Sequence, residues 1–210
     1  DLDYYYDELK ALGWELICCD INNIETISDI LPAECVILNL AAESHVDKSF
    51  DNVSDFTFAN VMGVQKLVSY CIKSRCRLLH VSTDEVYGEQ VEHAVDELHP
   101  LVPTNPYSAT KAAGDIFVQT YMKCFELDAK IIRANNIFGS RQLNEKLIPK
   151  AIYSASRGEV FYLHGTKELK RHFLHTDDFS RALLMIMNNW YTDKHNIYNI
   201  AGETELEVRE

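Results

Sequence analysis

The stretch "RLLHVSTDEVYGE", residues 77–89, joins a run typical of a buried strand to two adjacent carboxylic acids, Asp84 and Glu85. Four further apolar runs occupy residues 14–21, 35–42, 130–137 and 196–202. Between them lie segments with helical spacing of apolar residues, at 22–31, 50–75, 105–126, 144–158 and 175–190. Continuous strand-like runs that alternate with helices are typical of a parallel sheet covered on both faces. The sequence therefore predicts a doubly wound α/β fold.

The composition favours a small molecule as the partner. The 210 residues are 47% hydrophobic and carry a formal net charge of -12. Nucleic acids and anionic membrane surfaces need a basic face, so we expect neither as a partner. No stretch approaches the roughly 20 apolar residues that span a bilayer, and no basic and apolar leader opens the chain, which predicts a cytoplasmic protein. The six cysteines and eight histidines lack metal-ligand spacing, so we expect reduced thiols and no metal site.

Polar residues follow four of the strand-like runs. In doubly wound sheets, ligands bind beyond the carboxyl ends of the strands. The residues found there are Asp20-Ile21, Ala41 to His45, Thr83 to Glu85, and Asn135-Asn136. Any one of these sets alone is better explained as a cap or a turn. Polar clusters at several strand ends on one side of a sheet favour a binding site.

The acid pair, Asp84 and Glu85, poses a geometric problem. Successive side chains of a strand point to opposite faces, so the strand must end at Thr83 if both carboxyls are to share one pocket. Two carboxyls crowded together cannot both ionise cheaply, so their pKa values are driven apart. Such a pair would provide one acid and one base.

The segment "TNPYSATKAAGD", residues 104–115, predicts a helix that begins at Pro106 after a cap at Thr104 or Asn105. Tyr107 and Lys111 then lie four residues apart on one helix face. An ammonium near a phenol favours the phenolate form, which would make Tyr107 a usable base. A plain surface pair is the commoner explanation of this spacing taken alone.

The chain resembles the extended short-chain dehydrogenase/reductase superfamily, and within it the nucleotide-sugar 4,6-dehydratases that act on dTDP-glucose or UDP-glucose. The resemblance rests, in chain order, on "LAAESHVDKS", "HVSTDEVYGE", "NPYSATKAAGD", "NNIFG", "EKLIP" and "YNIAG". Y-x-x-x-K marks only the superfamily. The T-D-E triplet before V-Y-G is more specific, since related 4-epimerases and decarboxylases lack the Asp-Glu pair.

The resemblance implies an NAD-dependent lyase that oxidises C4 of a nucleotide-diphosphate glucose, eliminates water across C5 and C6, and reduces C6. Tyr107 would take the proton of the 4-hydroxyl, Lys111 would keep the tyrosine basic and contact the nicotinamide ribose, and Thr83 would bond the 4-oxygen. Glu85 would remove the C5 proton, and Asp84, when protonated, would donate to the departing hydroxyl.

The resemblance also implies binding residues. The cofactor positions are Asp20, Ile21, Leu40, Ala41, Ala42, Ser44 and Asn60, with Tyr107 and Lys111. The substrate positions are Ser44, Thr83, Asn136, Lys146, Leu147, His164 and Arg171. Arg171 is the strongest of these, because a guanidinium fork suits a phosphate. The family's N-N-Y-G reads N-I-F-G at residues 136–139, so one expected cofactor contact is lost.

The resemblance further predicts a Rossmann-like sheet that lacks its first βαβ unit, and with it the glycine-rich turn that seats the NAD pyrophosphate. We expect a partial NAD-binding domain at 1–140, a nucleotide-sugar-binding segment at 141–175, a return to the first domain at 176–200, and the start of a truncated substrate domain at 201–210.

Three questions stay open at this stage. The alternatives to a dehydratase are a nucleotide-sugar 4-epimerase or decarboxylase, or a binding subunit without catalysis. The nucleotide is undecided between dTDP and UDP, which differ in the base by one methyl. We also expect a homodimer built from the helices at about 51–74 and 107–126, with exposed apolar residues such as Phe117 and Tyr121.

Overall fold

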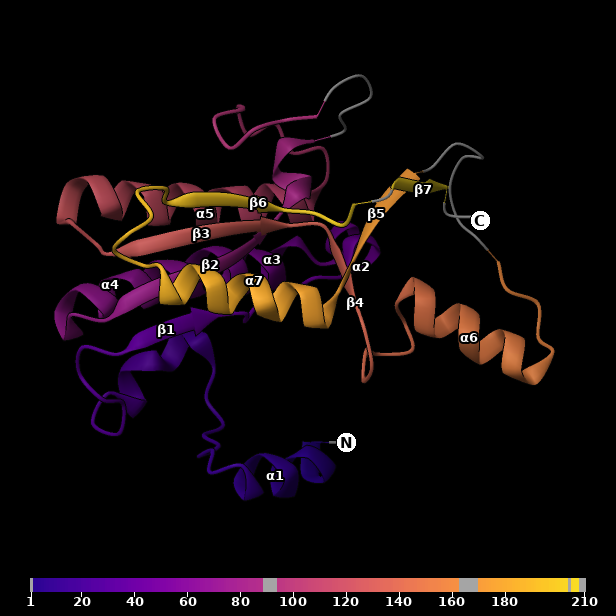
Figure 1. Ribbon diagram of the computed structural model, residues 1–210, viewed down its shortest axis with the longest axis horizontal. Helices are drawn as coiled ribbons and strands as arrows, with labels where there is room; N and C mark the ends of the chain where they lie inside the picture. The colour runs from indigo at the N-terminus through magenta and orange to yellow at the C-terminus, as the bar shows by residue number, and fades with distance from the viewer. Residues whose placement is uncertain (1, 89–93, 163–169, 204, 208–210) are drawn as a thin grey trace.

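The computed structural model describes residues 2–88, 94–162, 170–203 and 205–207. Its centre is a parallel sheet in the order β1 (Val36–Asn39), β2 (Arg77–Thr83), β3 (Ala129–Ala134) and β6 (Ile197–Ile200). Helices flank this sheet on both sides (Figure 1). The predicted α/β fold with a Rossmann-like parallel sheet is confirmed.

Neighbouring residues of the central strands are buried on opposite faces. Leu78 packs into a core with α4 (Val64–Ser74) and α5 (Pro106–Phe125), whereas Leu79 packs into a second core with α7 (Thr176–Asn188). Ile131 and Ile132 of β3 divide in the same way, and all four side chains are fully buried. Each such side chain contributes roughly 1.5–3 kcal/mol of transfer free energy. Two-sided burial explains why these strands read as continuous apolar runs.

The helical segment before α4 is divided into short pieces. It comprises α2 (Val46–Asp51), α3 (Val53–Thr57) and the π-helical turn η2 (Phe58–Gly63). Gly63 faces the 3₁₀ helix η1 (Ile21–Ile27), where a Cβ would lie 2.5 Å from Ile21 Cγ2. The close approach of η1 to η2 therefore requires glycine at this position.

The predicted strand at 14–21 is wrong. Residues 14–20 form no regular element between α1 (Leu2–Ala11) and η1, and Trp14 is 66% exposed. A strand needs a neighbour to satisfy its backbone groups. Within the part of the chain that the structure describes, no strand pairs with this run, and β1 forms the edge of the sheet.

A second, smaller sheet follows the first. The predicted run at 130–137 is split at Asn135 between β3 and β4 (Asn136–Phe138). β4 pairs in parallel with β5 (Lys170–His175), and β5 pairs antiparallel with β7 (Glu205–Glu207). The helix α6 (Leu147–Arg157) lies to one side of this sheet (Figure 1).

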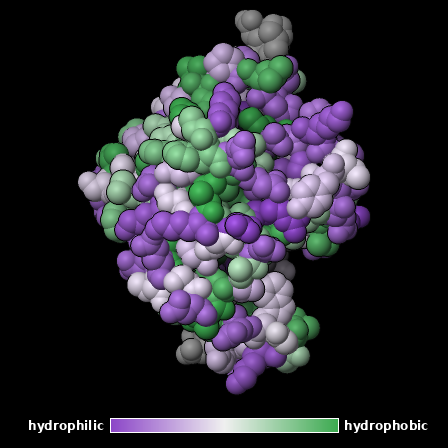
Figure 2. All heavy atoms as spheres, turned by 90° about the vertical axis from the view of Figure 1, so that its left-hand side faces the viewer, coloured by the Kyte–Doolittle hydropathy of each residue, from purple (hydrophilic) through white to green (hydrophobic). Residues whose placement is uncertain are grey.

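The described surface is mixed in character. Figure 2, which shows the left-hand side of Figure 1, has patches of apolar side chains among hydrophilic ones. No helix among the described residues is long and apolar enough to cross a membrane. All six cysteines are free thiols. The described ranges contain no group of three or more His, Cys, Asp or Glu side chains placed to hold a metal ion.

Candidate active site

The strand β2 ends where the acid pair requires it to end. Thr83 is its last residue and also caps the 3₁₀ turn η3 (Asp84–Tyr87), since Thr83 Oγ1 accepts from Glu85 N at 3.3 Å. The backbone leaves the extended conformation after Thr83, so the strand alternation no longer separates the two carboxyls. The prediction that the strand ends at Thr83 is confirmed.

Each carboxyl of the acid pair accepts a hydrogen bond from an asparagine. Asn135 Nδ2 donates to Asp84 Oδ2, and Thr83 Oγ1 donates to Asp84 Oδ1 at 3.2 Å. Asn105 Nδ2 donates to Glu85 Oε2 at 3.0 Å. The two amides come from the end of β3 and from the cap of α5. Three elements therefore hold the acid pair in place.

Burial raises the pKa of both carboxyls. For Asp84, the hydrogen bond from Asn135 opposes the rise in pKa. For Glu85, the negative charge of Asp84 adds to the rise in pKa, while the bond from Asn105 opposes it. Both pKa values shift in the same direction. The expectation that the pKa values of Asp84 and Glu85 are driven apart therefore stays a prediction. Upward shifts favour the protonated form of each carboxyl.

Tyr107 lies in the first turn of α5, close to the acid pair. The helix begins with Pro106 after a capping box formed by Asn105 and Ser108. The Tyr107 backbone N–H donates to the buried Ser49 Oγ at 3.2 Å, and its ring meets Phe56 edge-on with centroids 6.4 Å apart. These contacts hold the phenol, which is 9% exposed.

The electrostatics of Tyr107 differ from the prediction. Burial raises the pKa of the phenol, the Glu85 and Asp84 carboxylates raise it further, and a bond with Thr83 opposes them. The sequence spacing predicted a lowered pKa through Lys111. Burial and two negative charges raise this pKa instead, since each disfavours a further anion.

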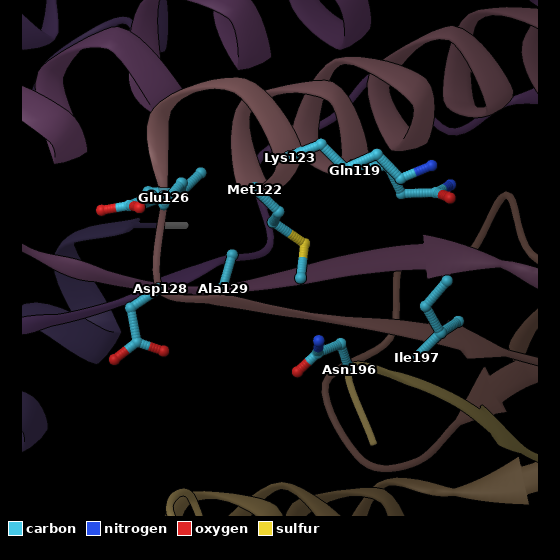
Figure 3. A pocket seen from close by; sticks show the side chains of 9 residues that line it. Gln119, Met122, Lys123, Glu126, Asp128, Ala129, Asn196 and Ile197 are labelled. Carbon is cyan, nitrogen blue, oxygen red and sulfur yellow. The ribbon is translucent and has the colours of Figure 1, made fainter. Parts of the chain in front are cut away.

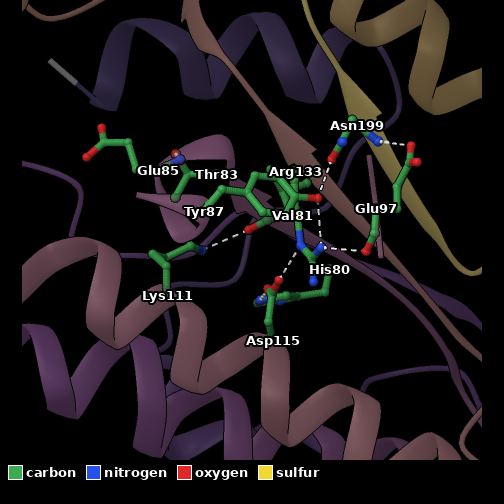
Figure 4. Close-up of polar contacts among 10 residues, drawn as sticks. All are labelled: His80, Val81, Thr83, Glu85, Tyr87, Glu97, Lys111, Asp115, Arg133 and Asn199. Atoms are coloured by element: carbon green, nitrogen blue, oxygen red, sulfur yellow. Dashed lines mark hydrogen bonds and ion pairs between the residues drawn. The ribbon is translucent and has the colours of Figure 1, made fainter. Parts of the chain in front are cut away.

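Lys111 is 4% exposed, and its Nζ donates to the Val81 carbonyl oxygen of β2 at 2.8 Å (Figure 4). Burial lowers the pKa of this ammonium to about 8, while the charge of Asp115 opposes the shift. Lys111 is therefore a largely protonated group at neutral pH whose position is set by the backbone of the central strand.

The predicted cofactor residues outside α5 lie on three segments, namely the loop after β1, η2 and the start of η1. Residues 40–44 follow β1 as an exposed loop, and Leu40 is 57% exposed. The buried Asn60 of η2 bonds both the N–H and the carbonyl of Glu43, at 2.9 Å each. Asp20 caps η1 by accepting from Asn22 N at 2.7 Å. The loop thus presents small apolar side chains in a fixed shape, which suits a flat ligand lying against the backbone.

Two of the predicted substrate residues, Lys146 before α6 and Arg171 on β5, act electrostatically on the acid pair. Lys146 Nζ donates to the Ser44 carbonyl oxygen at 3.2 Å, and its charge lowers the pKa of Glu85. The charge of Arg171 on β5 opposes the rise in the pKa of both carboxyls. Asn136 and Leu147 begin β4 and α6. His164 lies outside the described residues.

Sequence reasoning missed the groups that hold the acid pair and its surroundings. Asn105 was predicted only as a cap, and Asn135 only as a residue at a strand end. A buried ion pair, Arg133 Nε to Asp115 Oδ2 at 2.8 Å, was not predicted at all. An arginine within a run predicted to be a buried strand was the available signal, because buried charges need a partner.

A groove of 590 Å³ lies elsewhere, between the end of α5 and the starts of β3 and β6 (Figure 3). Met122, Asp128 and Asn196 are among its lining residues. These residues are at the amino ends of the strands, whereas the acid pair follows the carboxyl end of β2. The groove is therefore separate from the candidate site.

Comparison with known proteins identifies the relatives of this chain. The family described as GDP-mannose 4,6 dehydratase matches residues 4–210. The low-salt glycan biosynthesis protein Agl12 of Haloferax volcanii is 40% identical over 188 residues, which is 89% of this chain and 60% of the relative. The chain thus spans less than two thirds of that relative's length.

Two further relatives carry more informative names. The trifunctional UDP-glucose 4,6-dehydratase/UDP-4-keto-6-deoxy-D-glucose 3,5-epimerase/UDP-4-keto-L-rhamnose-reductase RHM1 of Arabidopsis thaliana is 37% identical, over 91% of this chain and 29% of the relative. The crystal structure of DesIV, a dTDP-glucose 4,6-dehydratase from Streptomyces venezuelae with NAD and TYD bound, matches with a TM-score of 0.85 and 36% identity. The match covers 91% of this chain and 59% of the DesIV chain.

Proposed function

Because the chain belongs to the GDP-mannose 4,6 dehydratase family, we propose that it acts in the NAD-dependent dehydration of a nucleotide-diphosphate glucose to the 4-keto-6-deoxy sugar. One observation carries the proposal: the acid pair is half-buried next to the phenol of Tyr107, whose pKa is raised by burial and then by both carboxylates. A Tyr-Lys site alone supports only oxidation and reduction. The adjacent carboxyls add the means to eliminate water.

We assign the cofactor site to the loop at 40–44, together with Asp20, Ile21, Asn60, Tyr107 and Lys111. The exposed loop that Asn60 holds in shape supports this assignment. When bound, NAD⁺ supplies the acceptor for the hydride that leaves C4 and the donor for the hydride that C6 receives. The predicted division of the chain at 140, 175 and 200 is part of the same proposal.

The first proton transfer is assigned to Tyr107, with Thr83 bonding the same sugar oxygen. The raised pKa of the phenol, caused first by burial, means that positive charge must stabilise its anion. Lys111 lies one helical turn away and remains a cation at neutral pH, because burial lowers its pKa only to about 8. Its bond to the Val81 carbonyl oxygen fixes the position of this charge at the central strand.

The elimination is assigned to the acid pair. Once C4 is a ketone, the C5 proton is acidic enough for Glu85 to accept it. Asp84 donates its own proton to the departing C6 hydroxyl, which leaves as water. The burial that raises the pKa of Asp84 favours the protonated form that this role requires.

We place the diphosphate of the substrate near Arg171 and Lys146, with Ser44, Asn136, Leu147 and His164 in the same binding region. The influence of both cations on the pKa of Glu85 supports their position facing the acid pair. A guanidinium fork binds phosphate oxygens in pairs. The names of the relatives include both dTDP-glucose and UDP-glucose enzymes, so the nucleotide is left to the experiment below.

We further propose a homodimer that forms through η2 and α5. Phe58 is 52% exposed, Met62 44% and Ile116 54%, which leaves apolar side chains on both elements. Phe117 and Tyr121, which the sequence indicated, are instead half-buried, and the Tyr121 hydroxyl bonds Ser69 at 3.0 Å. Light scattering with Ile116→Lys tests this, since a charge at the contact should yield monomers.

We propose a cytoplasmic location because the six cysteines are free thiols without regular spacing, which suits a reducing compartment.

The test of the function uses the natural full chain with NAD⁺ and either dTDP-glucose or UDP-glucose. We expect a 4-keto-6-deoxy product from one of them, detected by mass and by NMR of the sugar. Glu85→Gln should reduce its formation by about 10²–10⁴-fold, whereas Glu25→Gln, at an exposed ion pair with Lys73, should not. A simple epimer as product would favour the 4-epimerase alternative, and unimpaired turnover by Glu85→Gln would exclude the role given to the acid pair.

A further inference from the structure

The groups assigned to the reaction come from two different elements. Tyr107 and Lys111 stand on α5, whereas the acid pair stands on the short turn η3. A single 3₁₀ turn has few backbone bonds of its own. One backbone bond, from Val102 N to Val86 O at 3.0 Å, joins it to the segment before α5, and side chains provide its other contacts with α5.

One buried arginine connects these elements. Arg133 of β3 is 2% exposed, and its Nε donates to Asp115 Oδ2 on α5 at 2.8 Å. Its Nη1 donates to the hydroxyl of Tyr87, the last residue of η3, at 2.8 Å and to the Glu97 carbonyl oxygen at 3.2 Å. The guanidinium carbon also lies over the Tyr87 ring, 4.9 Å from its centroid. Figure 4 shows these contacts converging on the guanidinium.

The connection continues to the edge of the sheet. The Tyr87 hydroxyl donates to Asn199 Oδ1 on β6 at 2.7 Å. The Asn199 backbone N–H in turn donates to Glu97 Oε1 at 2.8 Å. Tyr87 is 2% exposed, so its hydroxyl needs these partners. The far end of η3 is thus tied to α5, β3 and β6 through one phenol.

Folding stability alone does not explain the buried ion pair between Arg133 and Asp115. Replacing a buried ion pair by apolar side chains of similar size is often neutral or favourable for folding. The planar guanidinium instead provides donors in fixed directions, which apolar packing does not. Asp115 also stands one helical turn beyond Lys111, so the pair is anchored next to the residues assigned to the first proton transfer.

We propose that Arg133 is a positioning residue that holds η3 against α5, and with them the acid pair against the Tyr107 phenol. This inference rests on the proposed function for its catalytic consequence, although the positioning itself does not depend on it. We name Asp115, Arg133 and Tyr87 the arginine clamp. Asn105 holds the first part of η3 through Glu85, and the clamp holds its end.

The test is Tyr87→Phe in the full-length protein, because it removes the hydroxyl and keeps the ring under the guanidinium. We expect kcat for the 4-keto product to fall by about 10- to 100-fold, with KM changed by less than about threefold. Amide hydrogen exchange should become faster at residues 84–88 but not in β1. Exchange measures the turn directly, without substrate or turnover.

The matched control is Tyr198→Phe, which removes a hydroxyl bonded to Lys130 Nζ and to the His195 carbonyl oxygen, both at 2.8 Å. A second test replaces both members of the ion pair, Asp115→Leu with Arg133→Met, so that neither is left without the other. Because Asp115 also acts on the pKa of Lys111, this variant is read by exchange alone, and it should give the same faster exchange at residues 84–88.

The proposal is overturned if Tyr87→Phe matches Tyr198→Phe in kcat and exchange, or if its exchange rises equally across the whole sheet. If the unsubstituted protein forms no 4-keto product, the proposed function fails, whereas the exchange comparison still decides whether the clamp positions η3.

Discussion

The side-chain amide of Asn105 donates a hydrogen bond to Glu85 Oε2 at 3.0 Å. The same side chain caps α5, because its Oδ1 accepts from Ser108 N at 2.8 Å. One residue therefore begins the helix of Tyr107 and also holds a carboxyl of the acid pair. The start of the helix and the orientation of the proposed base are coupled.

The two roles of Asn105 can be separated by substitution. Asn105→Ser keeps a good capping group but cannot reach Glu85, so we expect the free energy of unfolding to change by less than about 0.5 kcal/mol and kcat to fall about tenfold. Asn105→Ala should lose about 1 kcal/mol of stability in addition. Denaturant unfolding and steady-state kinetics measure the two effects. Equal activity of Asn105→Ser and the unsubstituted protein would show that the bond to Glu85 is dispensable.

Glu85→Gln should make the protein more stable at neutral pH. Burial and then the charge of Asp84 raise the pKa of this carboxyl in the folded state, so the folded state binds the proton more tightly than the unfolded state. The resulting cost is absent below the unfolded pKa of about 4.3, grows as pH rises toward the folded value, and is complete above it. The melting temperatures of the two proteins should therefore converge toward pH 4. A gain that is the same at pH 4 and pH 7 would contradict this cause.

The charge of Lys111 should limit activity in alkali. Burial lowers the pKa of its ammonium to about 8, so the cation is lost as pH rises through that value. We expect kcat to fall on the alkaline side near pH 8. Lys111→Arg should move this fall to higher pH even if its maximal rate is lower, since a guanidinium stays charged. An alkaline fall at the same pH in both proteins would assign it to another group.

Arg171→Lys should weaken substrate binding more than it slows the reaction. The substitution keeps the positive charge that lowers the pKa of both carboxyls of the acid pair. It removes the fork that binds two phosphate oxygens. We expect KM to rise about tenfold with kcat changed less, measured beside Arg157→Lys, an exposed arginine paired with Glu159. A change confined to kcat would place Arg171 outside the diphosphate site.

Local signals in the sequence predicted much of this structure. The apolar pairs Leu78-Leu79 and Ile131-Ile132 indicated strands buried on both faces, and the structure places them so. The segment at 104–108 indicated a helix start, and α5 begins at Pro106 after the Asn105 cap. Caps and strand runs depend on residues that are close in sequence, which is why patterns can identify them.

The sequence by itself determined the alternation of the central parallel strands with helices, the end of β2 at the acid pair, and the one-turn spacing of Tyr107 and Lys111. Only the tertiary structure decided that Arg133 bonds Asp115 and Tyr87, that residues 14–20 form no strand, and that the pKa of the phenol is raised by burial. Arg133 is 18 residues from Asp115 and 46 residues from Tyr87 in the sequence. The pKa of the phenol depends on the exclusion of water when the chain folds. A local sequence pattern does not identify a side chain's distant contacts, because contacts between distant segments and burial are properties of the assembled core.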